Sequence, residues 1–139
     1  MLKNKSKFVK SVYDNKKLLA IFVKKSFFKY IDQTTFLTGN KELFQMGFIR
    51  KNNELIQAHF HPDRKRIINK TSEFLILKKG KAKIKFFKNK NKLIESFNMN
   101  VDDMLLIYDG AHEITCSKNC LFLEIKQGPY NIKKDKKLL

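Results

Sequence analysis

Residues 73–86 read Glu-Phe-Leu-Ile-Leu-Lys-Lys-Gly-Lys-Ala-Lys-Ile-Lys-Phe, and this stretch decides the fold. Its second part, residues 81–86, alternates lysine with alanine, isoleucine and phenylalanine, which is typical of a strand with one buried and one solvated face. Residues 73–78 form a short apolar run, and Lys79-Gly80 is a turn signal between the two parts. The stretch therefore predicts two consecutive strands joined by a tight turn.

Further short strands are expected on both sides of this pair. Each is an apolar or alternating run bounded by Gly, Asn, Asp or Pro, and no segment has the period of a convincing amphipathic helix. Such strands at near-regular spacing predict an all-β barrel or jelly roll. The additional expected strands cover residues 18–23, 43–50, 55–61, 93–97, 104–108, 112–116 and 121–126.

The length of 139 residues corresponds to one domain. Residues 1–17 are basic and polar, and we expect a loose arm or an edge strand there. The β domain is expected over residues 18–130, followed by a basic tail over residues 131–139. A chain of this length buries about two-thirds of its unfolded surface, so no disulfide or structural metal is needed for folding.

The net charge of +17 raises the question of nucleic-acid binding. Only three of the thirty basic residues are arginine, and the lysines are spread along the whole chain. No helix-turn-helix, zinc finger or RNA-stacking motif accompanies them. The lysine excess predicts solubility and weak attraction to polyanions, and no specific nucleic-acid partner is expected.

No secretory leader or membrane span is expected, because the longest early apolar run, residues 18–23, is far too short. Cys116 and Cys120 flank a turn, where a disulfide is conceivable, although two reduced thiols are more typical of a chain without a leader. These features together predict a cytoplasmic protein.

Three histidines are the only ones in the chain: His59, His61 and His112. A spacing of two places His59 and His61 on the same face of a strand. Together with His112 and Glu73, these imidazoles would hold one divalent transition metal such as Fe, Mn, Zn or Ni. The alternatives are histidines buried in hydrogen bonds, and a Glu73 carboxylate paired with an arginine.

The histidines lie in two motifs that resemble those of the cupin superfamily, whose members are small double-stranded β-helices. The likeness extends to a functionally uncharacterised subgroup of single-domain bacterial cupins found near genes for surface polysaccharides and sugar modification. Eleven residues separate His61 from Glu73, where cupins usually have three or four. The resemblance rests on His59-x-His61, Glu73 seven positions before Gly80, and residues 18–21, 44–47, 66–73, 103–112 and 124–130.

The resemblance implies a single cupin barrel with His59, His61, Glu73 and His112 as metal ligands. It also gives Arg66, with Arg64 beside it, a role in holding a phosphate or carboxylate group of a substrate. A solvated loop is the alternative for both arginines. Gln57 and Tyr108 are further candidates for substrate binding, with wall packing as the alternative.

The implied function is a metal-dependent protein acting on a small oxygen-rich molecule, such as an isomerase or epimerase of surface-polysaccharide metabolism. The metal would act as a Lewis acid, and the catalytic base stays unknown. An iron-dependent dioxygenase and a non-catalytic ligand-binding protein are the alternatives. A homodimer is left open, because cupins commonly dimerise through their sheets.

Overall fold

A computed structural model describes residues 5–39, 42–131 and 133–139, and it is rich in β structure. Two short helical turns accompany ten strands among these residues. The elements are α1 Lys5–Phe8, β1 Val9–Asp14, β2 Lys17–Val23, η1 Lys25–Tyr30, β3 Thr35–Phe36, β4 Gly47–Phe48, β5 Glu73–Lys79, β6 Ala82–Asn89, β7 Lys92–Met99, β8 Met104–Ile107, β9 Ala111–Cys116 and β10 Leu121–Lys126.

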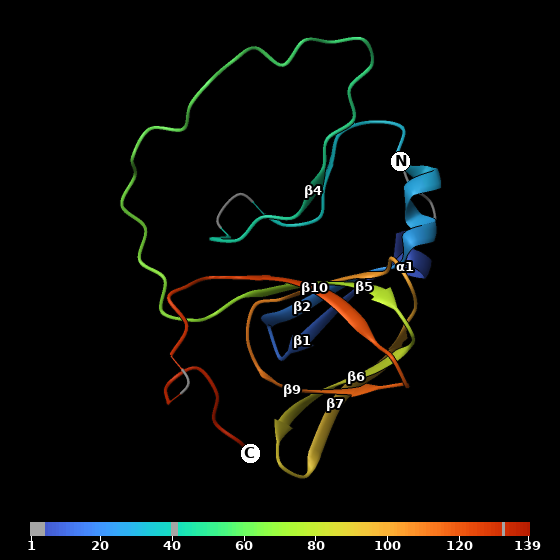
Figure 1. Ribbon diagram of the computed structural model, residues 1–139, viewed down its shortest axis with the longest axis vertical. Coiled ribbons are helices and arrows are strands. Elements are labelled where there is room, and N and C mark those ends of the chain that lie inside the picture. The colour runs from blue at the N-terminus through green and yellow to red at the C-terminus, as the bar shows by residue number, and fades with distance from the viewer. Residues whose placement is uncertain (1–4, 40–41, 132) are drawn as a thin grey trace.

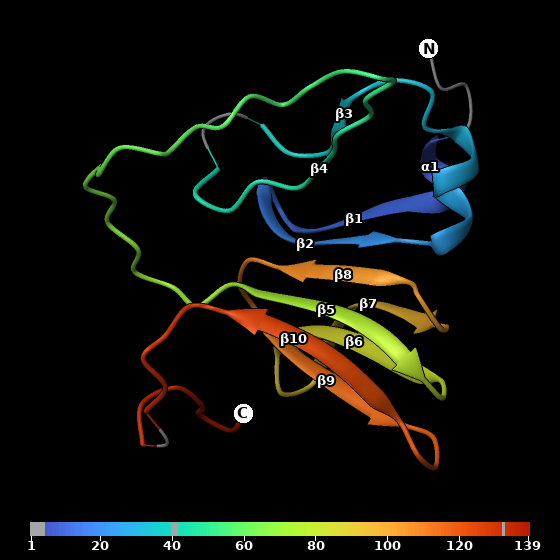
Figure 2. The same cartoon turned by 45° about the horizontal axis from the view of Figure 1, so that its top comes forward.

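The strands form three sheets and no closed barrel. The largest sheet has the order β1-β2-β8-β5-β10, a second has the order β7-β6-β9, and β3 and β4 form a small ribbon. All strand pairs are antiparallel. The three-stranded sheet covers one face of the five-stranded sheet, and the β3–β4 ribbon lies on the opposite face of the five-stranded sheet (Figures 1 and 2). Among the described residues, no helix is long and apolar enough to cross a bilayer.

The main core lies between the two larger sheets. Ala82, Ile84 and Phe86 alternate along β6 and are 4%, 0% and 0% exposed, while the intervening lysines face solvent or the sheet rim. They pack against Leu75 and Leu77 of β5 in one cluster of buried residues. Burying one large apolar side chain stabilises the fold by about 1.5–3 kcal/mol. The alternation of residues 81–86 therefore determines which face of β6 turns towards the core.

The five-stranded sheet is also covered on its opposite face. Phe27 of η1 is fully buried there and packs with Ile21, Leu106 and Met46, and with the half-buried Phe74. Strands β2, β5 and β8 therefore bury side chains on both faces. This double burial explains why their sequences read as continuous apolar runs rather than alternating ones.

Most of the expected strands are confirmed, with small shifts of their ends. Part of the expected basic arm forms the edge strand β1, which pairs with β2. The strand expected over residues 43–50 is reduced to Gly47–Phe48. The strand expected over residues 55–61 does not form in this structure, because that stretch has no neighbouring strand to take its backbone hydrogen bonds.

Residues 49–72 instead make a long connection that swings away from the sheets (green in Figure 1). It starts beside β3, where the Arg50 amide donates to Thr34 Oγ1 at 3.1 Å. It returns through a Lys70–Asp109 ion pair and a Ser72 amide that donates to Gln127 Oε1 at 2.7 Å. Hydrogen bonds and an ion pair thus anchor the two ends of the connection to the sheets, and the residues between them are exposed.

Candidate metal centre

Glu73 and His112 meet between the two larger sheets. Glu73 opens β5 opposite Ile107, so its side chain shares the inner face with that core residue. His112 lies opposite Phe86 in the β6–β9 ladder, and opposed residues of an antiparallel pair share a face. The two side chains consequently approach from different sheets, and Glu73 Oε2 lies 3.4 Å from His112 Nε2.

Each partner shifts the pKa of the other. The side chains of Glu73 and His112 are 17% and 28% exposed. The hydrogen bond to His112 lowers the pKa of Glu73, against the effect of burial. The hydrogen bond to Glu73 raises the pKa of His112, again against burial. Each side chain therefore favours the charged form of the other.

The second ring nitrogen of His112 has its own partner. His112 Nδ1 lies 3.1 Å from the Gly110 carbonyl, which can only accept a hydrogen bond, so Nδ1 carries the proton. Nε2 then remains as the nitrogen that can bind a metal after losing its proton to solvent. A backbone carbonyl that fixes the outer nitrogen in this way is the usual support for a metal-binding histidine.

The other two histidines lie in the exposed connection. The rings of His59 and His61 contact each other edge to face, with 5.2 Å between their centroids. His59 Nδ1 donates to the Gln57 carbonyl at 2.8 Å, which again leaves Nε2 free. Among the described residues, no group of three or more His, Cys, Asp or Glu side chains gathers closely enough for a metal ion. The four expected ligands thus form two separate pairs.

The expected substrate-binding residues are also divided. Gln57, Arg64 and Arg66 lie exposed in the same connection as His59 and His61. Arg66 Nη1 donates to the Arg64 carbonyl at 3.5 Å, the limit of a hydrogen bond. Neither arginine belongs to a strand, and the solvated loop given as the alternative for both is what the structure shows. Their expected role in holding a phosphate or carboxylate group stays a prediction.

Tyr108 lies on the wrong face of the sheet for the expected role. It follows Ile107, so it points to the side opposite Glu73 and packs in the cluster around Ile21. Its hydroxyl donates to the Phe44 carbonyl at 2.5 Å. Burial raises the pKa of Tyr108 to about 12, which makes it a structural hydrogen-bond donor.

Lys126 is a neighbour of the pair that the sequence motifs do not single out. It lies opposite Glu73 in the β5–β10 ladder and thus shares the inner face. Its ammonium is 3.5 Å from Glu124 and its charge helps to lower the pKa of Glu73. The sequence pattern of β10 could have predicted this position. Phe122, Glu124 and Lys126 share one face of the strand, and Phe122 packs against the core, so both charged side chains lie on the inner face.

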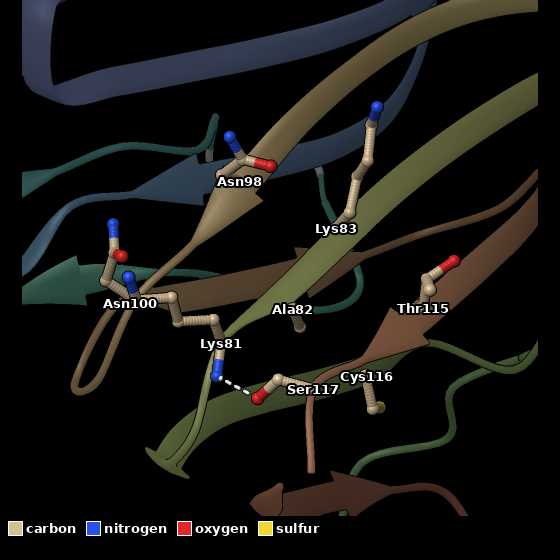
Figure 3. Close-up of a pocket in the computed structure, with 8 residues that line it drawn as sticks. All are labelled: Lys81, Ala82, Lys83, Asn98, Asn100, Thr115, Cys116 and Ser117. Carbon is tan, nitrogen blue, oxygen red and sulfur yellow. Dashed lines mark hydrogen bonds between the residues drawn. The ribbon is translucent and has the colours of Figure 1, made fainter.

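A separate polar hollow of about 500 Å³ lies at the other end of the three-stranded sheet (Figure 3). The amide of Lys81 donates to Ser117 Oγ at 2.9 Å at its border. Among the described residues that line it there is no carboxylate or imidazole, and the Cys116 thiol is the one side chain of a metal-binding type. Its lining comprises Lys81, Ala82, Lys83, Asn98, Asn100, Thr115, Cys116 and Ser117.

Comparison with known proteins gives no assignment: no protein-family model, no curated protein and no solved structure matches the chain.

Proposed function

We propose that this chain is a metal-binding protein of the cupin type that acts on a small oxygen-rich molecule. The observation that supports this most is the contact between Glu73 and His112 on the inner faces of two packed sheets. The two side chains come from different strands and face each other between the sheets. An imidazole nitrogen and a carboxylate oxygen would provide two of the ligands of a mixed nitrogen and oxygen metal site.

The donor atoms of the pair fit a transition metal. Metal–nitrogen and metal–oxygen bonds are about 2.0–2.2 Å long, so two neighbouring ligands on one ion lie about 3 Å apart. The distance of 3.4 Å between Glu73 Oε2 and His112 Nε2 requires only a small adjustment. His59 and His61 would supply the other two nitrogens, and the Nδ1 hydrogen bond of His59 leaves its Nε2 available.

The length of the connection between the two halves of the site allows this. Residues 62–72 lead directly from His61 to Glu73, and these twelve Cα-to-Cα steps span at most about 43 Å. This linker is therefore long enough for both histidines to reach the pair. Since the same segment carries Arg64 and Arg66, a substrate phosphate or carboxylate would meet guanidinium groups at the edge of the site.

When bound, the metal would supply Lewis-acid polarisation of substrate oxygens. Lys126, on the inner face beside Glu73, is positioned to hold an anionic group or to exchange a proton. A sugar isomerase or epimerase of polysaccharide metabolism would use these properties. An iron-dependent dioxygenase is the second candidate, since the same ligand set suits Fe(II).

Elemental analysis of the purified full chain tests the proposal. We expect about one equivalent of a divalent transition metal per chain in the wild type, and a loss of at least about tenfold in affinity in Glu73→Gln and His112→Ala. Oxygen consumption by an iron-loaded sample would favour the dioxygenase over the isomerase.

Glu113→Gln is the matched control. Glu113 is the residue after His112, but it faces the outer side of the sheet, where it accepts a hydrogen bond from Lys85 Nζ at 2.6 Å. This variant is expected to keep the full metal content. A wild type without stoichiometric metal, or equal loss in Glu73→Gln and Glu113→Gln, would refute the proposal.

A further inference from the structure

The polar hollow of about 500 Å³ on the three-stranded sheet lies outside the candidate metal centre. Figure 3 shows that the side chains of Lys83, Asn98 and Thr115 project to one side of the sheet, while those of Ala82 and Cys116 project to the other side. Ala82 is buried in the main core, so the three polar side chains stand on the outer face. They therefore lie on the face of the sheet opposite to the metal centre.

The strand register explains why these side chains gather. Lys83 of β6 is paired with Asn98 of β7 on one side and with Thr115 of β9 on the other. Paired residues of antiparallel strands share a face and lie about 5 Å apart, so an ammonium, a carboxamide and a hydroxyl form one row across the sheet. A second set of the same three groups lines the hollow two positions nearer the end of the sheet. It comprises Lys81, Asn100 and Ser117.

The two lysines of the hollow carry charges that the described part of the chain does not neutralise. Neither Lys81 nor Lys83 belongs to an ion pair there. Lys85, the next lysine on the same face of β6, pairs instead with Glu113 at 2.6 Å. Residues two positions apart on a strand are separated by about 7 Å. Two positive charges thus stand close together with no carboxylate among the residues that line the hollow.

Backbone hydrogen bonds hold the second row in place. The Ser117 amide donates to the Lys81 carbonyl at 2.9 Å, and the Lys81 amide donates to Ser117 Oγ at 2.9 Å. Because Ser117 Oγ accepts this bond, its own O–H group can donate to a ligand. The Asn100 amide donates to Asp103 Oδ2 at 2.8 Å, which fixes the backbone and leaves the exposed carboxamide pointing into solvent. The donors of the hollow are therefore carried by an ordered frame.

We propose that the polar hollow binds the phosphate group of a small phosphorylated molecule. Two ammonium groups balance the two negative charges of a phosphate monoester, and the carboxamides and hydroxyls donate to its oxygens. Small-molecule sites usually measure about 300–1,000 Å³, so the hollow has room for a phosphate and an attached organic group. This site lies apart from the metal centre and does not depend on the proposed function.

The lining favours a small molecule over a nucleic acid. Sites for single-stranded nucleic acids combine a basic groove with aromatic rings on which bases stack. None of the described residues that line the hollow is aromatic. The Lys85–Glu113 ion pair also neutralises the next row of the sheet, so the uncompensated charge does not continue along β6. The hollow is therefore a confined anion site rather than part of a basic stripe.

NMR titration of the EDTA-treated, ¹⁵N-labelled full chain with inorganic phosphate tests the proposal. The buffer is held near pH 8, where phosphate is mainly a dianion, and contains about 0.15 M NaCl to screen weak surface attraction. We expect saturable shifts of the amides of residues 81–83, 98–100 and 115–117. Shifts that spread over the lysine surface without saturation would overturn the proposal. Shifts confined to Arg64 and Arg66 would overturn it in favour of the long connection.

Two exposed residues of the first row are substituted separately. Lys83→Gln should weaken phosphate binding by at least about fivefold, because a charge-assisted hydrogen bond is lost. Asn98→Ala should weaken it by about threefold, through the loss of a neutral hydrogen bond and with no change of net charge. Both side chains point to solvent, so neither substitution removes core packing. Unchanged affinity in both variants would overturn the proposal.

Lys92→Gln is the matched control. It removes the same charge from an exposed lysine at the far end of the β6–β7 hairpin, where Lys92 is paired with Asn89. Its affinity for phosphate should stay within about twofold of wild type, since an exposed charge at this distance is screened. Equal weakening in Lys83→Gln and Lys92→Gln would show that phosphate follows the net charge, and would overturn the site.

A single-stranded oligothymidylate provides the comparison with nucleic acid. We expect it to perturb amides across the lysine surface, with an affinity that falls steeply as salt is raised. Perturbation confined to the amides of the hollow, at a lower concentration of phosphate groups than inorganic phosphate requires, would make nucleic acid the ligand and overturn the proposal. Metal content, measured separately, decides the metal centre whichever result the phosphate titration gives.

Discussion

At the scale of single residues, the Glu73–His112 pair combines two opposite pKa shifts. The raised pKa of His112 stabilises the fold fully below its ordinary value of 6.5, and this contribution is lost as pH rises through the raised value. The lowered pKa of Glu73 stabilises the fold above its ordinary value of 4.5, and this is lost as pH falls through the lowered value. Both contributions are present together between those two ordinary values.

The first prediction follows for the metal-free protein. Glu73→Gln should lower the free energy of unfolding by about 1 kcal/mol near pH 5.5, because a partly exposed charged hydrogen bond is lost. The difference from wild type should shrink as pH rises through the raised pKa of His112, because the imidazole then loses its charge. Urea unfolding of EDTA-treated samples across pH measures this, and a difference that does not change with pH would contradict it.

Tyr108 gives a second prediction at this scale. Tyr108→Phe removes the hydroxyl that donates to the Phe44 carbonyl and should reduce the free energy of unfolding by about 1 kcal/mol. Because the ring lies on the face opposite Glu73, metal content should stay unchanged. Denaturant unfolding beside elemental analysis checks both, and lost metal with unchanged stability would restore Tyr108 to the site.

At the scale of elements, the turn between β5 and β6 depends on Gly80. Its φ is +88°, and a Cβ there would lie 2.8 Å from Cys120 Sγ and 3.0 Å from Ser117 Oγ. Any residue other than glycine at this position would therefore place its Cβ against the Cys120 side chain. Three hydrogen bonds with Lys81 hold this corner together. The Cys120 thiol and the Ser117 amide donate to the Lys81 carbonyl, and the Lys81 amide donates to Ser117 Oγ.

Gly80→Ala should reduce the free energy of unfolding by about 1–3 kcal/mol, through left-handed backbone strain and the close contact. Gly39→Ala is the control, since nothing lies within 4 Å of a Cβ at that position. Its effect should stay within about 0.5 kcal/mol. Thermal unfolding of the two variants compares them, and equal effects would show that the corner tolerates a side chain.

The sequence predicted the elements whose pattern is local. Residues 81–86 alternate between lysine and apolar residues, and the apolar runs at β2, β8 and β10 are bounded by turn residues. These strands could therefore be predicted from the sequence. The stretch 55–61 also alternates, yet in this structure it has no partner. An alternating pattern reports which side chains share a face, whereas a strand also needs a neighbour, and the neighbour depends on distant residues.

For the site, the sequence predicted that Glu73 and His112 lie together, and the two side chains are in contact in the structure although they are far apart in the chain. Their role as metal ligands stays a prediction. Their faces follow from parity with Leu75 and Ile114, which are core residues. Of the two alternatives for Tyr108, the structure shows packing, on the face opposite Glu73. Tyr108 ends an apolar run that is buried on both faces, so the sequence pattern does not reveal which face it occupies. Lys126 was missed because a lysine in this lysine-rich chain carries little information by itself.

At the scale of the whole molecule, stability rests on the space between the two larger sheets. Phe86 is fully buried there, stacks near Phe97 with 6.3 Å between ring centroids, and lies 6.0 Å from the ring of His112. The apolar core thus supports one wall of the candidate metal centre. A substitution that weakens packing around Phe86 should therefore also disturb the position of His112.

Phe86→Ala should reduce the free energy of unfolding by about 3–5 kcal/mol, since it leaves a large cavity between the sheets. Phe60→Ala, which removes a ring that is 84% exposed, should cost far less. Urea unfolding of both variants makes the comparison. Similar losses would mean that Phe60 is buried as deeply as Phe86.

The four-ligand metal centre is tested most directly by X-ray absorption at the cobalt edge, on wild-type protein loaded with one equivalent of Co²⁺. We predict scattering from three imidazole rings, those of His59, His61 and His112, with the remaining scatterers being oxygen. Glu73→Gln should keep the imidazoles while weakening binding. A spectrum with one imidazole or none, or cobalt that binds no more tightly than to buffer, would contradict the metal centre.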